Sequence, residues 1–342
     1  MTSGDGLDKH HSAYAKTRRS LPSSSPRSAS CASPNKSNQR SIGVPASWIS
    51  FLSSGNDSSA NAIVKVWRLQ NNVPIGQCSV FSRAAVGPAF VAFSPDGQYF
   101  TIAWNGDYVY TYHVPDFLLV GEAKSSPNPL YGVGFSADSK TVLSIDWDGL
   151  DNGTLYADQP DGTAISQQVL GVDPDFFTVS PVASGGVTTM AVAGYNGNFG
   201  VYTWNGSAFT GPIVRTTVAG AAGSAIRFSR DGLMLAEGTN DGSIRFWNVP
   251  ITNSSAPSGA AITIGDIPFG LSFSALGDQI AVGFGSEIDT WSVSTRAMLG
   301  RHGVVAPPGG TIQYVDSTTF SASGSAVVVG EDKCGKFLIC SD

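Results

Sequence analysis

The four histidines are the first candidates for catalysis, because imidazole is the commonest general base near neutral pH. They are His10, His11, His113 and His302, and none has a cysteine or serine partner at a recognisable nucleophile spacing. The sequence also lacks the GxSxG, HExxH and phosphate-binding GxxxxGK[ST] patterns. We therefore predict that the protein is not an enzyme. An active site that gathered residues from distant segments would leave no local motif, so catalysis is kept as a minor alternative.

Three aromatic side chains stand at equivalent places, each before an Asn-Gly or Asp-Gly pair. They begin the triplets Trp104-Asn105-Gly106, Trp147-Asp148-Gly149 and Tyr195-Asn196-Gly197. Aromatic rings beside carboxylates suit a peptide that carries lysine or arginine, through buried area, cation-π contact and charge pairing. We predict a partner-binding site made of Trp104, Asp107, Asp146, Trp147, Asp148 and Tyr195. The alternative is that these rings pack as core.

The acidic segment DWDGLDNG, residues 146–153, alternates Asp and Gly as a calcium loop does. Leu150 stands at the fifth position of the segment and no glutamate follows at the twelfth, so an elongated solvated turn is favoured over a calcium site. The four cysteines form no CxxC pair and have no histidines at ligand spacing, which argues against zinc. No metal site and no cofactor are expected.

These candidate residues belong to a unit that recurs along the chain. The aromatic residue that closes the third strand of each unit is Trp67, Tyr112, Tyr156, Trp204, Trp247 or Trp291, with Cys340 in the seventh place. The intervals are 45, 44, 48, 43, 44 and 49 residues. Four short strands at this period are typical of β-propeller blades, and one aromatic per blade at fixed phase indicates core packing. The sequence predicts an all-β, seven-bladed β-propeller of four-stranded antiparallel blades.

The repeats resemble the WD-repeat β-propeller family over residues 42–342. The resemblance rests on FSPDG at 93–97, FSRDG at Phe228–Gly232, NDGSIRFWNV at Asn240–Val249 and LGRHGVV from Leu299. No blade carries the Trp-Asp dipeptide at the end of its third strand, so the family's buried hydrogen-bond network is expected to be broken in most blades. The resemblance implies a protein-interaction platform that displays loops on a rigid ring. It also implies that an N-terminal segment, residues 27–40, supplies the missing outer strand of the last blade.

Charge divides the chain into two parts. Residues 1–41 carry seven basic and two acidic side chains, which leaves 13 basic and 24 acidic residues in 42–342. We therefore expect a disordered basic Ser/Pro-rich tail at 1–41 and an acidic propeller at 42–342. An acidic body repels phosphate backbones and attracts basic partners, so no nucleic acid is expected at the propeller.

The predicted function is a non-catalytic, monomeric interaction scaffold for basic peptides or protein partners. No apolar run is long enough to span a membrane, and a cytoplasmic location is expected. The alternative is an exported or lipid-anchored propeller, attached through the N-terminal segment around Cys31, that binds sugar or another extracellular ligand. The tail lacks the apolar region that secretory signals need, which disfavours the alternative.

Overall fold

The computed structural model describes residues 50–56, 62–70, 73–83, 87–105, 108–114, 116–123, 126, 128–149, 152–194, 197–216, 221–303, 315–320, 326–331 and 337–341. Within these ranges the regular elements are all strands, which confirms the all-β class. No helix long and apolar enough to cross a membrane occurs in the described ranges. The predicted tail and the predicted closing strand at 27–40 lie outside the described residues.

Seven antiparallel sheets account for all the described strands, five with four strands and two with three. The first four sheets contain β1 (Ser50–Asn56), β2 (Ala62–Gln70), β3 (Val73–Arg83); β4 (Gly87–Phe93), β5 (Tyr99–Asn105), β6 (Val109–His113), β7 (Leu119–Ala123); β8 (Leu130–Phe135), β9 (Val142–Asp146), β10 (Thr154–Asp158), β11 (Ala164–Val169); and β12 (Phe176–Val179), β13 (Thr188–Ala193), β14 (Asn198–Trp204), β15 (Phe209–Thr216). The last three contain β16 (Gly223–Phe228), β17 (Met234–Thr239), β18 (Ser243–Asn248), β19 (Ile262–Thr263); β20 (Gly270–Phe273), β21 (Gln279–Phe284), β22 (Glu287–Ser292), β23 (Met298–Gly303); and β24 (Val315–Phe320), β25 (Ala326–Glu331), β26 (Phe337–Ser341). Each predicted repeat therefore corresponds to one sheet.

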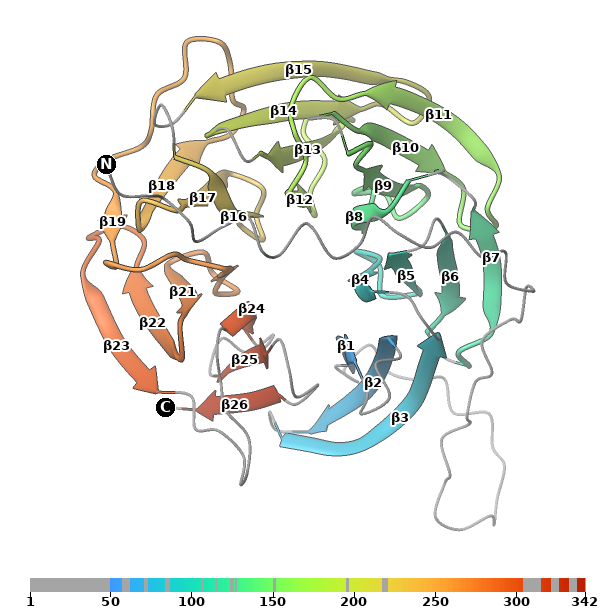
Figure 1. Cartoon of the computed structure of the whole chain (residues 1–342), viewed down its shortest axis with the longest axis horizontal. Helices are drawn as coiled ribbons and strands as arrows, with labels where there is room; N and C mark the ends of the chain where they lie inside the picture. The colour runs from blue at the N-terminus through green and yellow to red at the C-terminus, as the bar shows by residue number, and fades with distance from the viewer. Residues whose placement is uncertain are drawn as a thin grey trace, which may run out of the picture.

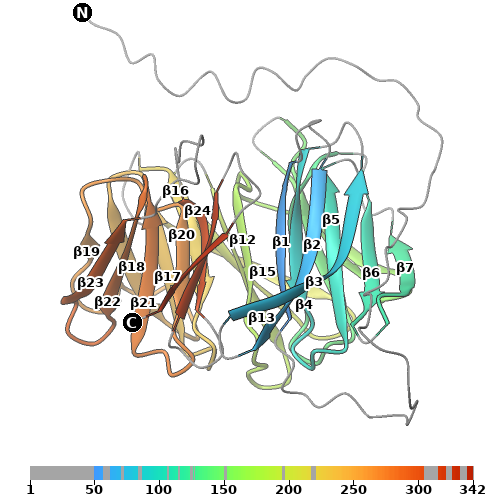
Figure 2. The ribbon, with the colours of Figure 1, turned by 90° about the horizontal axis from the view of Figure 1, so that it is seen from below.

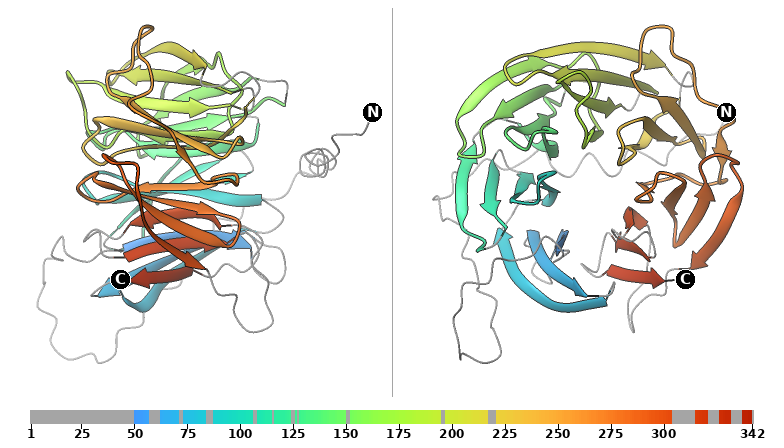
Figure 3. Two further views of the ribbon diagram at one scale, coloured as in Figure 1. Left: turned by 90° about the vertical axis from the view of Figure 1, so that its left-hand side faces the viewer. Right: turned by 180° about the vertical axis from the view of Figure 1, so that it is seen from behind.

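The sheets stand around a common centre in chain order, with the first strand of each sheet innermost (Figure 1). In side view the strands run between the two faces of the ring (Figure 2), and the view from behind shows the same circular order (Figure 3). Strand β1 of the first sheet contacts β25 of the last, so the two ends of the series are neighbours. This arrangement is a β-propeller, as the repeats predicted.

A local hydrogen-bond pattern explains why the FSxDG motif marks a turn. In the hairpin between β4 and β5, the Ser94 hydroxyl donates to Asp96 Oδ1 at 2.6 Å, and the same oxygen accepts from the Gln98 amide at 3.0 Å. Gly97 has a φ of 70°, which a residue without Cβ adopts at no steric cost. The same Ser-to-Asp bond recurs between β8 and β9 and between β16 and β17.

The core lies between successive sheets rather than within one central mass. Phe100 and Ile102 of the second sheet pack with Val64, Val66 and Phe81 of the first, and all five are fully buried. Similar clusters join the following pairs of neighbouring sheets through the sixth. This repeated contact gives a stack of blades whose loop ends are fixed in place.

The predicted role of the third-strand aromatics is confirmed in most of the ring. Tyr112, Tyr156, Trp204 and Trp247 are buried, and Trp291 is half-buried against the core of the fifth and sixth sheets. Trp67 is an exception, because it lies in β2, the second of the three described strands of its sheet. Only β1 (Ser50–Asn56) precedes β2 among the described strands of this sheet, and the predicted packing of the Trp67 side chain stays a prediction.

Candidate partner-binding site

One face of the ring carries the connections that lead into the inner strands and the turns that follow the second strands. We call it the connection face. In the third sheet the two kinds of segment touch, because the Trp147 amide, just after β9, donates to the carbonyl of Pro129, just before β8, at 3.2 Å. The predicted site residues of this sheet are therefore held at the same face as the entrance to β8.

The side chain of Trp104 is not available to a partner on that face. Its side chain has no exposed surface and packs with Val66, Phe100 and Tyr110 in the core between the first two sheets. Trp104 follows Phe100 and Ile102 at a spacing of two, so all three project from the same side of β5. The prediction of Trp104 as a binding residue was wrong, and the core alternative holds. Asp107 and Tyr195 lie outside the described residues.

Asp146 is the centre of a buried hydrogen-bond network. Its Oδ2 accepts from the Ser126 hydroxyl, from Asn128 Nδ2 at 3.0 Å and from the Tyr156 hydroxyl at 2.9 Å. Its Oδ1 accepts from the Thr154 amide at 2.6 Å. The carboxylate has no exposed surface, so neither a partner contact nor a solvated turn describes it. Its role is to join the connection before β8 to strands β9 and β10.

Trp147 and Asp148 remain at the surface of the connection face. Trp147 is half-buried and meets the ring of Tyr131 edge to face, with the centroids 5.6 Å apart and an angle of 70°. Asp148 is exposed, and its Oδ1 accepts from the amide of Asn152 at 3.2 Å, which closes the turn. The segment thus presents one supported aromatic pair beside one carboxylate.

Two further carboxylates belong to the same place. Asp173 and Asp175 lie in the connection from β11 into β12, and the Asp175 amide donates to the Ala193 carbonyl at 3.0 Å. A Cβ at Gly194 would collide with the backbone carbonyl oxygen of Asp173, and one at Gly153 would lie 2.8 Å from Cγ of Pro174. Only glycine leaves room for the connection at these two points. The acidic segment is therefore fixed between the third and fourth sheets.

The carboxyl groups of this connection and the Tyr131 phenol influence one another electrostatically. Burial and the neighbouring Asp173 raise the pKa of Asp175 to about 7. Burial, then the charges of Asp175 and Asp173, raise the pKa of the Tyr131 phenol. Tyr131, Trp147, Asp173 and Asp175 thus form one group, which we call the acidic-aromatic cluster. A perturbed carboxyl of this kind is typical of functional sites.

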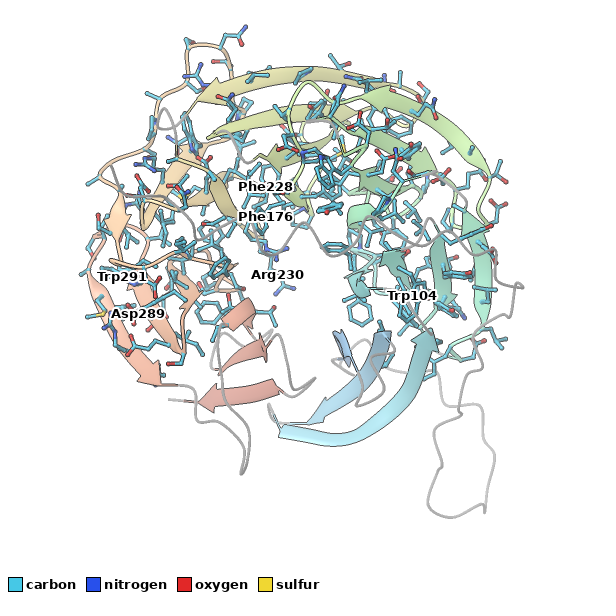
Figure 4. The ribbon with its side chains drawn as sticks, in the orientation of Figure 1. Trp104, Phe176, Phe228, Arg230, Asp289 and Trp291 are labelled. Carbon is cyan, nitrogen blue, oxygen red and sulfur yellow. The ribbon has the colours of Figure 1, made fainter. Side chains whose placement is uncertain are left out.

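Two arginines elsewhere in the ring, Arg301 and Arg245, are already paired with carboxylates. Arg301 holds the buried Asp289 through two hydrogen bonds of 2.8 Å, and it lies 3.3 Å from Glu287. Arg245 pairs with Asp241 at 3.0 Å. Asp289 is far around the ring from Trp104 (Figure 4). Arg301 faces two carboxylates and Arg245 faces one, so both guanidinium groups are engaged away from the acidic-aromatic cluster.

Sequence reasoning missed Tyr131, Asp173 and Asp175. The signal was present in the Asp173-Pro174-Asp175 run, which stands between two repeats. It was overlooked because the repeats were aligned on the turns after the second strands, whereas the connections between repeats reach the same face of a propeller.

Comparison with known proteins supports the architecture. No family model matches the sequence, and no curated protein matches it. Among solved structures the chain is similar to the beta-propeller domain of Myceliophteria thermophila Cps50 (Swd1), with a TM-score of 0.64 and 13% sequence identity. The match covers 87% of this chain and 98% of that one. This likeness shows a β-propeller fold, in agreement with the WD-repeat resemblance of the sequence.

Proposed function

We propose that the protein is a non-catalytic interaction scaffold that binds basic segments of protein partners at the acidic-aromatic cluster. The observation that carries this proposal is the meeting of two carboxylates, Asp173 and Asp175, with the paired rings of Tyr131 and Trp147. A lysine or arginine side chain can place its charge beside the carboxylates and its aliphatic stem against the rings.

The fold supports such binding in two ways. The Asp173–Asp175 connection is fixed by its backbone contacts at Ala193 and Gly194, so little ordering entropy is lost when a ligand binds. Residues 42–342 carry 13 basic and 24 acidic side chains, so the ring attracts basic ligands and repels nucleic acids.

The test is titration of the full chain with a fluorescent peptide of lysine and serine, compared with a peptide of glutamate and serine. We expect only the lysine peptide to bind, and Trp147→Ala to weaken its binding about tenfold through loss of the ring contact. Asp175→Asn should weaken it by a similar factor above pH 7. The matched control is Asp161→Asn, an exposed carboxylate in the turn between β10 and β11.

Three results would count against the proposal. Equal binding of the lysine and glutamate peptides would remove the charge argument. Binding that Trp147→Ala leaves unchanged, in a variant that still melts cooperatively, would move the site elsewhere on the ring. Oligosaccharide binding that needs Trp147 but neither carboxylate would favour the sugar-binding alternative.

A further inference from the structure

The face opposite the connection face carries the hairpin turns between the first and second strands, and we call it the hairpin face. Its turns differ at one repeated position, two residues after the serine of each hairpin. This position holds Asp96 in the second sheet and Asp138 in the third, but Val182 in the fourth and Leu276 in the sixth. At this position an aliphatic side chain therefore stands in place of the carboxylate in two blades.

The fifth sheet lies between these two and adds a third aliphatic residue. Its hairpin keeps the carboxylate, Asp231, but places Leu233 directly after the turn glycine. The exposed fractions are 44% for Val182, 64% for Leu233 and 85% for Leu276. Hairpin tips normally carry polar residues, so three exposed aliphatics in successive blades form an unusual apolar run on this face.

The three side chains lie on neighbouring hairpins. A Cβ on Gly232, the residue before Leu233, would be 3.3 Å from Cβ of Val182, so the fourth and fifth hairpins touch. The inner strands β16 and β20 also contact each other, which brings the sixth hairpin next to the fifth. We call Val182, Leu233 and Leu276 the hairpin-face patch.

A single cation accompanies this patch. Arg230, in the fifth hairpin, is exposed and extends toward the centre of the ring (Figure 4). It makes no hydrogen bond or ion pair with any residue in the described ranges. The carboxylates of the fifth and sixth hairpins bond within their own turns instead: Asp231 accepts from Ser229 at 2.6 Å, and Asp278 accepts from Ser274 at 2.7 Å. A serine hydrogen bond does not neutralise a carboxylate, so Asp231 and Asp278 add negative charge to this surface. Arg230 is the cation of these two hairpins that can pair with a carboxylate of a ligand.

We propose that the hairpin-face patch and Arg230 form a second docking surface, for a partner segment that carries aliphatic side chains and a carboxylate. The aliphatic residues of the partner lie on Val182, Leu233 and Leu276, and its carboxylate pairs with Arg230. A guanidinium binds a carboxylate through parallel hydrogen bonds, which fixes the orientation of the segment. This chemistry is opposite in charge to that of the connection face, so the two surfaces select different partners.

The test uses the full chain and a fluorescent peptide of leucine and glutamate, with a peptide of leucine and glutamine as its neutral match. The triple variant Val182→Ser, Leu233→Ser, Leu276→Ser should raise the dissociation constant of the leucine-glutamate peptide at least about tenfold. Arg230→Gln should raise it severalfold for the glutamate peptide and leave the glutamine peptide unchanged. All four side chains are exposed, so the variants should keep the melting temperature of the wild type.

The matched control is Leu118→Ser, because Leu118 is 63% exposed but lies next to the outer strand β7 of the second sheet. An equal loss of binding in this variant would show non-specific apolar contact and overturn the proposal, as would failure of the wild type to bind the peptide. Sedimentation of the protein alone tests whether a second copy of this chain, rather than a different partner, occupies the patch. If the wild type is a dimer and the triple variant is a monomer, the patch belongs to a second copy of this chain. That result would also overturn the proposed partner.

Discussion

At the scale of single residues, the roles of neighbouring acidic side chains differ because their surroundings differ. Asp146 is fully buried with four hydrogen-bond donors, whereas Asp148, two residues later, is exposed. Asp146→Ala would leave the hydroxyls of Ser126 and Tyr156 and the amide of Thr154 without their acceptor. We expect the free energy of unfolding to fall by about 3 kcal/mol, measured by urea denaturation.

The control for this substitution is Asp148→Asn, which keeps the turn acceptor at the surface. It should change the free energy of unfolding by less than about 0.5 kcal/mol. Equal effects of the two substitutions would contradict the network as described. The D146A variant should also lose lysine-peptide binding only to the extent that it unfolds, since Asp146 itself is not exposed to a ligand.

Asp175 makes a pH-dependent prediction. Its pKa in the folded protein is raised to about 7, mainly by burial and then by Asp173, against about 3.9 in an unfolded chain. A raised carboxyl pKa contributes stability that is complete below pH 4 and is lost as the pH rises through 7. Asp175→Asn should therefore increase the free energy of unfolding at pH 8, by about 2 kcal/mol once solvent screening is allowed for. The gain should vanish near pH 4.

Denaturation at pH 4, 6 and 8 tests this expectation. Asp161 is the control, since hydrogen bonds from Thr163 lower the pKa of its carboxyl, and Asp161→Asn should give no gain at pH 8. The ionisation of Asp175 should also affect peptide binding. A bound cation favours ionised Asp175, so lysine-peptide affinity should rise with pH through 7. A flat stability difference between pH 4 and 8 would argue against the raised pKa.

At the scale of elements, the connection from β11 to β12 depends on close backbone contacts. Gly194→Ala would put a methyl group against the carbonyl of Asp173. We expect a loss of about 2 kcal/mol in the free energy of unfolding, because the connection must move away from β13. Lysine-peptide binding, measured by fluorescence titration in the folded protein, should weaken as Asp173 and Asp175 are displaced.

Gly303→Ala is the matched control, because nothing lies within 4 Å of the Cβ it would add at the end of β23. It should leave both stability and peptide binding unchanged. A Gly194→Ala variant with wild-type binding would mean that the acidic connection tolerates movement, and that its fixed position does not contribute to affinity.

The same elements explain how much could be predicted from the sequence. The strands and hairpins were predictable because their causes are local: alternating side chains, Ser-to-Asp turn bonds such as Ser94 to Asp96, and glycine at positive φ. The different burial of Trp104 and Trp147 was not predictable, although both residues precede the same kind of turn. Trp104 is buried by residues of the preceding sheet, including Val64 and Phe81, and no local pattern reveals that contact.

At the scale of the whole molecule, the ring separates two kinds of surface. The connection face carries the acidic-aromatic cluster, and the hairpin face carries the exposed aliphatics of the hairpin-face patch and Arg230. Because both faces are built from the same seven sheets, binding on one should not require a change in the other. A lysine peptide and a leucine-glutamate peptide should therefore bind the same molecule at once, with independent affinities.

The charge of the whole chain gives the last prediction. The full chain has a net charge of −6, and the seven basic residues of 1–41 offset part of the acidic ring. Removing residues 1–41 should raise the association rate constant of a lysine peptide severalfold at low salt, since long-range attraction steers the encounter. Stopped-flow fluorescence at increasing salt should show this difference disappearing as the charges are screened. If the truncated and full chains associate equally fast at low salt, the net charge of the ring does not guide its partners, and affinity must come from the local contacts of the acidic-aromatic cluster alone.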